Sequence, residues 1–245
     1  ISDKTIEMLY TGKMNALDKQ QHDETLQHKL EMLRVAGIGV KTYEQLAKQK
    51  ITTLHDLKTA HANQTITLTH AQSLGVRYYD DLQSRIPHQE AKQLDTYMHK
   101  LPLKENQHVQ FVGSYRRKKP SSGDIDILLC NVSIADCIEY IEKSYSILGF
   151  ITKGKEKASF LMVIDKKVRH IDLLTTTTDK YVCAVMYFTG SKLFNIKMRL
   201  HAKKKGYLLN EHRLTHIQSK QNIMLHKEKD LFDVLGMKYV KPENR

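Results

Sequence analysis

The chain has 245 residues, of which 40% are hydrophobic and 27% are charged, a composition typical of globular proteins. It contains no run of about 20 apolar residues, so the sequence excludes a membrane-spanning protein. Lys and Arg outnumber Asp and Glu by 39 to 27, which gives a formal net charge of +12. The chain begins with Ile1 rather than Met, and we expect further N-terminal sequence before it. We expect free thiols rather than a disulfide framework or a zinc site, because no C-x-x-C spacing joins Cys130, Cys137 and Cys183.

The positive charge lies almost entirely in the second part of the chain. Residues 1–100 carry 13 Lys and Arg against 12 Asp and Glu, a net charge of +1. Residues 101–245 carry 26 against 15, a net charge of +11. Such asymmetry is typical of proteins that bind polyanions, most often nucleic acid. A basic surface without a partner explains the composition equally well, so charge alone does not decide between the two.

The first hundred residues show the spacing of helices. Apolar residues at helical intervals predict a helix around Leu26, Leu30 and Leu33 and another after residue 40. Between them lies a Gly-Ile-Gly turn, residues 37–39, which lets the backbone approach a phosphate group at the start of the second helix. This pattern predicts a helix-hairpin-helix motif that binds DNA. A plain corner between two helices is equally compatible with it.

After Pro87 the pattern changes to that of a mixed α/β domain. We expect a helix over residues 91–98, short strands over 109–112 and 124–129, and an amphipathic helix over 134–148. Two further strands, 160–164 and 168–174, form a hairpin around the turn at 165–167. The fold class is therefore α+β, with a helical domain followed by a domain that contains a mixed sheet.

The strongest chemical signal is the segment from Gly113 to Asp126. Asp124 and Asp126 are two residues apart on a predicted strand, so their carboxylates lie on one face and repel each other unless a cation lies between them. Carboxylates of this kind are ligands that Mg²⁺ prefers. Ser114 and Arg117, just upstream, supply a hydroxyl and a fork of donors suited to phosphate oxygens. The segment therefore predicts a site for metal-dependent phosphoryl chemistry.

A third carboxylate, that of Asp172, follows 46 residues after Asp126 on a predicted strand. We expect an antiparallel neighbouring strand to place it beside the first two. Three such carboxylates with two divalent ions are the arrangement of two-metal phosphoryl transfer.

The segment GSYRRKKPSSGDIDILL, residues 113–129, resembles the nucleotidyltransferase signature of family X DNA polymerases of the beta type. Residues 187–199, 228–239, 85–87 and the Gly-Ile-Gly turn also resemble segments of that family, in the same order. The resemblance implies a helix-hairpin-helix domain, a catalytic palm with a mixed sheet and a small α/β subdomain that selects the nucleotide. It implies four parts with boundaries 1–20, 21–87, 88–178 and 179–245, the first being the end of a lyase-type domain.

The resemblance also implies roles for individual residues. Asp124 and Asp126 would bind both metal ions, and Asp172 would help to activate the primer 3′-hydroxyl. The residues implied to contact the incoming nucleotide are Arg85, Ser114, Arg117, Ser122, Gly123, Asp124, Tyr187, Phe188, Gly190 and Asn195. Those implied to contact DNA are Gly37, Gly39 and Arg199. The backbone carbonyls implied to bind a monovalent cation, Na⁺ or K⁺, are those of Leu33, Val35 and Ile38. Lys4 would be the Schiff-base lysine of the lyase domain, which requires a neutral amine.

Three features depart from the family pattern. His170 replaces an arginine that orients the third aspartate, and we expect it to donate a single hydrogen bond in its place. Lys192 replaces an aspartate near the incoming base, and we expect tighter nucleotide binding with less discrimination. The stretch from His212 to Lys227 is shorter than in the family. We expect none of these to touch the metal-binding carboxylates.

The expected function is DNA-directed DNA synthesis that fills short gaps in base-excision repair, with 5′-deoxyribose-phosphate lyase activity in the full-length protein. Two Mg²⁺ ions, replaceable by Mn²⁺, are the expected cofactors. Expected partners are gapped or nicked DNA, deoxynucleoside triphosphates and other repair proteins, with the chain itself a monomer. The expected location is the nucleus, with a mitochondrial or virus-encoded enzyme as alternatives. An error-prone or template-independent transferase and a non-catalytic DNA-end-binding module remain as alternative functions.

Overall fold

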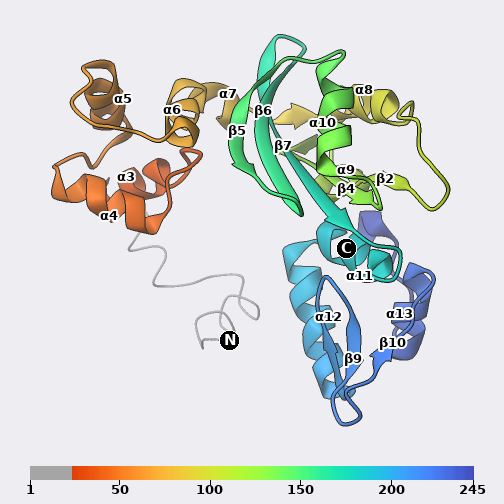
Figure 1. The fold of residues 1–245 in the computed structure, drawn as a ribbon. Helices are drawn as coiled ribbons and strands as arrows, with labels where there is room; N and C mark the ends of the chain where they lie inside the picture. Colours follow the sequence, from red (N-terminus) through yellow and green to blue (C-terminus); the bar gives the residue numbers. More distant parts are fainter. Residues whose placement is uncertain (1–23) are drawn as a thin grey trace. The chain divides into compact units, whose positions relative to one another are not determined.

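The computed structural model describes residues 24–245, and Figure 1 shows how its helices and strands are arranged. The chain divides into two compact units between Tyr79 and Asp80. Lys4 and the segment 1–20 lie outside the described residues, so the four-part division stays a prediction. A search of the described helices finds none that is both long and apolar enough to cross a membrane.

The first unit is helical. Its helices are α3 (Glu24–Met32), α4 (Val40–Lys48), α5 (Leu54–Ala62) and α6 (His70–Arg77). Thr53 and Thr69 begin α5 and α6 with capping boxes, in which each hydroxyl accepts a backbone N–H that the helix leaves unpaired. The buried cluster of this unit contains Met32, Val35, Ile38, Tyr43, Leu46, Ile51, Leu54, Leu57, Val76 and Tyr79.

The turn between α3 and α4 contains the predicted glycines. Gly37 has a φ of +80°, and a Cβ there would lie 3.0 Å from the backbone nitrogen of Gln72. Gly75 on α6 lies closer still, since a Cβ would come within 2.2 Å of the carbonyl oxygen of Ala36. The predicted helix, glycine turn and second helix are therefore confirmed. The turn is packed directly against α6 through positions that only glycine fits.

The second unit contains a five-stranded mixed sheet in the order β2-β4-β7-β6-β5. Its strands are β2 (His108–Phe111), β4 (Ile125–Cys130), β5 (Ile147–Lys153), β6 (Lys157–Ile164) and β7 (Lys167–Thr176). β4 and β7 are parallel, and the other pairs are antiparallel. The predicted hairpin of β6 and β7 is confirmed, with Asp165 and Lys166 both at positive φ in the turn.

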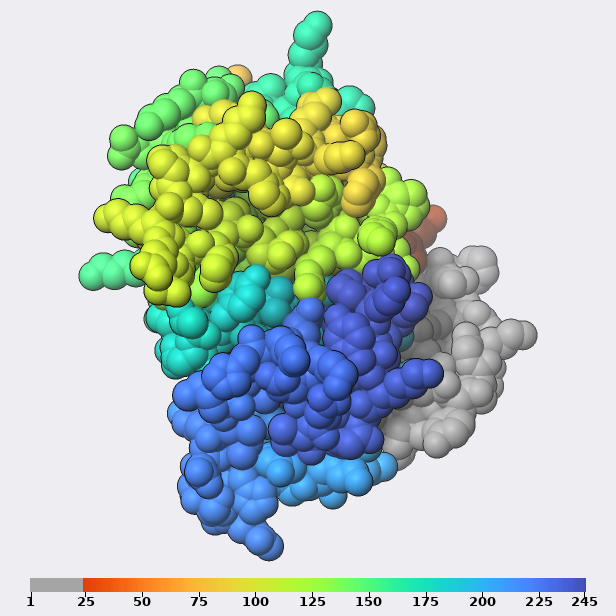
Figure 2. Space-filling view, turned by 90° about the vertical axis from the view of Figure 1, so that its right-hand side faces the viewer, coloured from red at the N-terminus to blue at the C-terminus, as the bar shows by residue number. Residues whose placement is uncertain are grey.

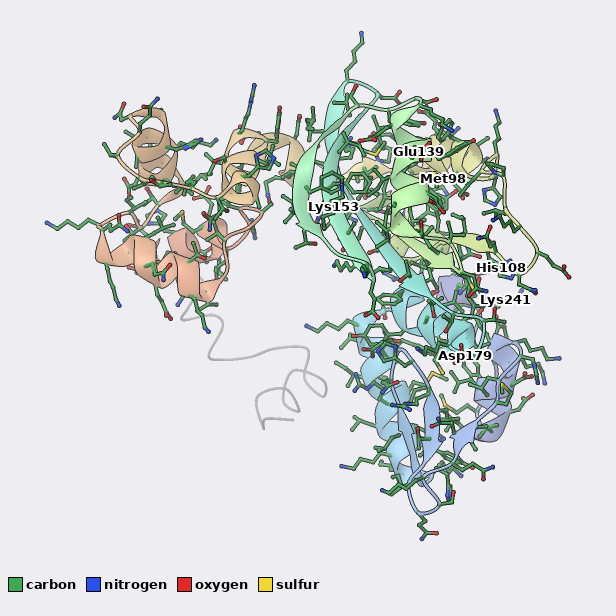
Figure 3. The ribbon with its side chains drawn as sticks, in the orientation of Figure 1. Met98, His108, Glu139, Lys153, Asp179 and Lys241 are labelled. Carbon is green, nitrogen blue, oxygen red and sulfur yellow. The ribbon has the colours of Figure 1, made fainter. Side chains whose placement is uncertain are left out.

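The two faces of this sheet have different environments (Figure 3). Helices α8 (His88–Met98) and α10 (Ile134–Glu142), which carry the labelled Met98 and Glu139, pack against one face of the sheet. That face contributes Ile125, Ile127 and Ile171 to the larger buried cluster. The opposite face packs only partly, where α11 (Tyr181–Thr189) covers Leu128 and Leu174. Polar side chains near α11 therefore remain accessible on this second face.

The predicted helix over residues 134–148 is wrong in its second half. The helix α10 ends at Glu142, and Ile147 already begins β5, which the sequence analysis missed. Apolar residues at 147, 148 and 150 continue a plausible helical face. In the structure they instead lie on an irregular edge strand with two register shifts against β6.

The C-terminal part of the second unit is a small α/β layer. It contains α12 (Lys192–Lys204), a three-stranded sheet of β8 (Tyr207–Leu209), β9 (Leu214–His216) and β10 (Asn222–Ile223), and α13 (Glu228–Val234). Figure 2 shows this part, in blue, packed against the part that contains the larger sheet, in yellow and green. Two short strands, β1 (Ile86–Pro87) and β3 (Ser121–Ser122), pair with each other. Cys130, Cys137 and Cys183 are buried and free, as predicted.

Candidate active site

Two of the predicted metal ligands lie opposite each other on neighbouring strands. Asp126 on β4 and Asp172 on β7 are register partners, so their side chains share the partly open face of the sheet. Asp124 immediately precedes β4, two residues before Asp126. The predicted antiparallel pairing is wrong: β7 meets β4 as a parallel strand and pairs antiparallel with β6 on its other side. The structure still brings the carboxylates together.

Asp126 is the carboxyl group whose pKa this arrangement raises most clearly. Burial, together with the negative charges of Asp124 and Asp172, raises the pKa of its carboxyl group to about 7. The positive charges of Lys157 and Arg117 oppose this shift. A bound cation would relieve the same repulsion, because it favours the ionised form of every carboxylate around it.

Asp172 is held by a residue that the sequence analysis did not single out. The ammonium group of Lys157 lies 2.8 Å from Asp172 Oδ2. His170 Nε2 instead shares a hydrogen bond with the hydroxyl of Ser159 at 2.5 Å, and lies 3.4 Å from Asp172 Oδ1. The expectation that His170 donates to Asp172 is therefore wrong, because Ser159 is the closer partner. The expectation that it stays away from the metal-binding carboxylates is also wrong.

The donor set fits a hard divalent cation, although the side chains do not form a closed ligand set. Within residues 24–245, no three His, Cys, Asp or Glu side chains are arranged to hold a metal ion. Asp172 Oδ1 is buried without a hydrogen-bond partner. The donors of Asp124, Asp126 and Asp172 are all carboxylate oxygens, the chemistry that Mg²⁺ and Mn²⁺ require. An unpartnered acceptor beside a carboxyl group under like-charge repulsion is what such a cation would satisfy.

Groups suited to binding phosphate oxygens adjoin the carboxylates. Gly113 has a φ of +58°, and a Cβ there would lie 2.1 Å from Asp126 Oδ2, so the backbone passes directly over this carboxylate. Ser114 Oγ and Ser122 Oγ are 2.8 Å apart. Arg117 donates to the carbonyl of Thr189 at 2.5 Å, while its Nε is buried without a partner.

The arginine side chains retain donors for an anion. Burial lowers the pKa of the Arg117 guanidinium, and the charge of Asp126 acts against that shift. Arg85 donates to the hydroxyl and the carbonyl of Ser121 at 3.2 and 2.7 Å. A Cβ at Gly123 would lie 3.3 Å from Arg85 Nη1, so this guanidinium lies against the loop before β4. Guanidinium groups that keep free N–H donors are suited to a triphosphate.

A cavity of about 500 Å³ joins these groups to the start of α12. The predicted site residues that line it are Gly113, Ser114, Arg117, Asp124, Asp126, Tyr187, Phe188, Gly190, Asn195 and Arg199. Lys192 and Ile196 complete the lining. Asn195 is fixed by a hydrogen bond from its side-chain amide to the carbonyl of Tyr187 at 2.7 Å. Arg85, Ser122, Gly123 and Asp172 lie outside the lining; Ser122 is linked to it by its hydrogen bond with Ser114, and Asp172 by its register pairing with Asp126.

An ion-pair network ties the short helix Gly113–Arg116, which follows β2, to the C-terminal layer. Arg116 makes a two-pronged pair with Glu228, at 2.7 and 3.0 Å, and donates to the hydroxyl of Thr189. Arg245 contacts the same carboxylate at 2.8 Å and lies over the rings of Phe194, Phe232 and Tyr239. Sequence reasoning missed this network. The available signal was the adjacent pair Arg116 and Arg117 together with a glutamate, Glu228, near the end of the chain. Adjacent arginines, 116 and 117, thus both bind Thr189, next to the cavity.

The residues predicted to bind a monovalent cation lie in the first unit. Val35 and Ile38 are buried, and the Val35 carbonyl accepts the Ile38 N–H at 3.0 Å. A carbonyl oxygen keeps a second lone pair after one such bond. Gln72 donates to the carbonyl of Gly37 at 3.3 Å, which further fixes this turn.

Because the pKa of Asp126 is raised, we expect the metal-free protein to lose stability as the pH rises. The carboxyl group is held neutral in the folded chain up to about pH 7, whereas its ordinary pKa is 3.8. The contribution of this carboxyl group to the free energy of unfolding is therefore fully present below about pH 4. It falls as the pH rises through 7, and the total loss is at most about 4 kcal/mol. Urea denaturation should show Asp126→Asn more stable than the wild type near pH 8 and equal to it near pH 4. A difference that does not change with pH would contradict this assignment.

Comparison with known proteins agrees with this geometry. The family model described as the fingers domain of DNA polymerase lambda matches residues 30–83. The models for the DNA polymerase beta palm and thumb match residues 85–184 and 184–245. Similar curated proteins include DNA polymerase lambda of Arabidopsis thaliana, 28% identical over 270 residues that cover 98% of this chain and 50% of the relative.

Two other relatives match over the whole chain. DNA polymerase lambda of Rattus norvegicus is 28% identical and is covered over 46% of its length. DNA nucleotidylexotransferase of Gallus gallus is 24% identical and is covered over 56%. The chain thus spans about half the length of the curated relatives it matches. Because the three family models match in succession and cover nearly all the described residues, the chain belongs to the family X DNA polymerases.

Proposed function

We propose that this chain is the polymerase part of a DNA-directed DNA polymerase that fills short gaps. The observation that carries the proposal is the register pairing of Asp126 with Asp172 beside a cavity lined by Arg117 and Asn195. The relatives named DNA polymerase lambda support it. The basic charge after residue 100 also favours a nucleic-acid substrate.

In this proposal the residues of the chain divide the reaction between them. Asp124, Asp126 and Asp172 would hold two divalent ions, Mg²⁺ or Mn²⁺, which when bound lower the pKa of the primer 3′-hydroxyl and neutralise the triphosphate. Asp172 would accept the proton of that hydroxyl or orient it. Ser114 and Arg117, with Arg85, Ser122 and Gly123 around them, would hold the phosphate oxygens in line for attack.

The base and sugar of the incoming nucleotide would lie against the start of α12. Tyr187, Phe188 and Gly190 line the cavity on that side, together with Asn195. Aromatic faces bind a sugar and base without reading the sequence. Arg199, further along α12 and also in the cavity lining, would contact the minor groove of the template, where it would read geometry rather than base identity.

The remaining parts of the proposal concern DNA and cell context. The turn with Gly37 and Gly39 would bind a DNA phosphate through a Na⁺ or K⁺ ion held by the carbonyls of Leu33, Val35 and Ile38. Gapped or nicked DNA, deoxynucleoside triphosphates and other repair proteins would be its partners, and a nuclear, monomeric enzyme of base-excision repair its setting. The lyase role of Lys4 stays a prediction.

Primer extension on a one-nucleotide gap tests the proposed function. We expect Mg²⁺-dependent addition of the nucleotide complementary to the template, and much slower extension of an unpaired primer. Equal or faster extension of the single-stranded primer would favour a template-independent transferase. Tight binding of gapped DNA without any incorporation would favour a non-catalytic DNA-end-binding module.

The transferase alternative is favoured by one specific observation, the presence of Lys192 in the cavity. A cation there attracts any nucleotide triphosphate without regard to its base. We expect Lys192→Asp to raise the KM for the incoming nucleotide about tenfold, equivalent to about 1.4 kcal/mol, and to increase the preference for the correct base. Steady-state kinetics with correct and incorrect nucleotides would measure both effects. Lys197→Asp, on the same helix but outside the cavity lining, is the control; an equal effect there would show that only net charge matters.

A further inference from the structure

Lys157 is the first residue of β6, directly after the tight turn that follows β5. The turn joins β5 to β6, after the labelled Lys153 in Figure 3, and the N–H of Gly154 donates to the carbonyl of Lys157 at 2.8 Å. In the β6–β7 ladder Ser159 pairs with Asp172, and Lys157 pairs with Leu174. Side chains two residues apart lie on one face, so Lys157, Ser159 and Asp172 share the face that carries Asp126.

The contacts on Asp172 divide its two carboxylate oxygens. Oδ2 accepts from Lys157 at 2.8 Å. Oδ1 is buried and has no hydrogen-bond partner, with His170 Nε2 at 3.4 Å and already bonded to Ser159. Among the described residues, Lys157 is therefore the cation in direct hydrogen-bond contact with this carboxylate. Asp172 itself is only 14% exposed, whereas Lys157 is 52% exposed.

We propose that Lys157 is a positioning residue for Asp172: it holds Oδ2 from the neighbouring strand and leaves Oδ1 free for the reacting centre. The inference rests on the proposed function, because it concerns how one of the three carboxylates is oriented. A carboxylate held at one oxygen presents the other in a single direction, which is what supporting contacts supply at metal sites. In this chain the positioning cation comes from β6 rather than from β7.

The opposite role would be that of a placeholder. If Lys157 only occupied the space of a divalent cation, its removal would tighten metal binding and leave catalysis intact or faster. If it positions Asp172, its removal weakens both. The two roles therefore differ in the sign of the effect.

The test compares the Lys157→Gln variant with two rescues. We expect Lys157→Gln to lower kcat for gap filling about 10- to 100-fold, with the KM for the nucleotide within about threefold. Lys157→Arg should retain most of the activity. Adding His170→Arg to Lys157→Gln should restore at least part of it, because the side chain at position 170 lies on the same face and already comes within 3.4 Å of this carboxylate, so a guanidinium there can hold it. Lys155→Gln, in the same turn, is the control for loss of positive charge near DNA.

A second readout is independent of turnover. Mn²⁺ binding to the wild-type and variant proteins, measured by calorimetry, should be about tenfold weaker for Lys157→Gln and unchanged for Lys155→Gln. Unchanged or tighter Mn²⁺ binding, unchanged kcat, or failure of both arginine rescues would overturn the inference. If the wild type incorporates no nucleotide, the proposed function fails, and the Mn²⁺ measurement alone then decides whether Lys157 positions Asp172.

Discussion

Asp126→Asn is expected to slow nucleotide incorporation by at least about 10³-fold while leaving the affinity for gapped DNA within about threefold. The substitution keeps the size of the side chain and removes one negative charge and one acceptor. The negative charges of Asp124 and Asp172 both raise the pKa of Asp126, so this carboxyl group interacts with each of the other two. Within residues 24–245, Asp126 is the carboxylate that pairs in register with Asp172. Single-turnover incorporation and a separate binding titration would measure the two quantities.

The matched control is Asp136→Asn, an exposed aspartate in the first turn of α10. It removes the same charge from the same unit and should change neither quantity. Incorporation that survives in Asp126→Asn would refute the assignment of this carboxylate. Loss of DNA binding together with activity would instead point to a damaged fold, which the pH-dependent stability of the same variant would reveal.

The parts of this site that could be predicted are formed by residues close together in the sequence. Asp124 and Asp126 lie two residues apart at the start of β4, which predicts that they share a face, and Ser114 and Arg117 lie within and directly after the short helix Gly113–Arg116. The two glycines of the helical turn are likewise local. Local spacing and the resemblance together identified all the residues that line the cavity except Ile196.

The direction of strand pairing could not be predicted in this way. Whether β7 meets β4 as a parallel or antiparallel strand depends on the whole path through α10, β5 and β6. The edge strand β5 was missed because its residues alternate poorly and two register shifts interrupt its ladder. Lys157 was missed for a related reason, since its partner is set by the register of β6 on β7.

A further long-range pair supports a second large expected effect. Removing the positive charge of Arg169 is expected to destabilise the protein by about 3–5 kcal/mol, because it leaves the carboxylate of Glu90 buried without its partner. Arg169 is 1% exposed and makes a two-pronged pair with Glu90 at 2.6 and 2.8 Å. It also donates to the hydroxyl and the carbonyl of Ser84. Its position on β7 was a signal in the sequence, because residues 169, 171 and 173 share the core face and only Arg169 is charged.

Urea denaturation of Arg169→Met would measure this loss. The double variant Arg169→Met with Glu90→Leu should recover most of the stability, because a buried pair replaced by apolar side chains often costs little. Lys229→Ala, which breaks an exposed pair with Asp233, should cost about 0.5 kcal/mol or less. A cost for Arg169→Met as small as that of this control would show that Glu90 is not dependent on its partner.

The same variants distinguish stability from catalysis. Arg169 lies three residues before Asp172 on β7, and its pair joins this strand to α8. If the pair only holds the strand in place, the double variant should fold, bind gapped DNA and incorporate nucleotides within about tenfold of the wild type well below its melting temperature. Asp126→Asn, in contrast, should be stable and inactive. Loss of activity in a stable double variant would instead mean that the buried charges set the position of Asp172, since a displacement of about 1 Å at a reacting group is enough to cost about 100-fold in rate.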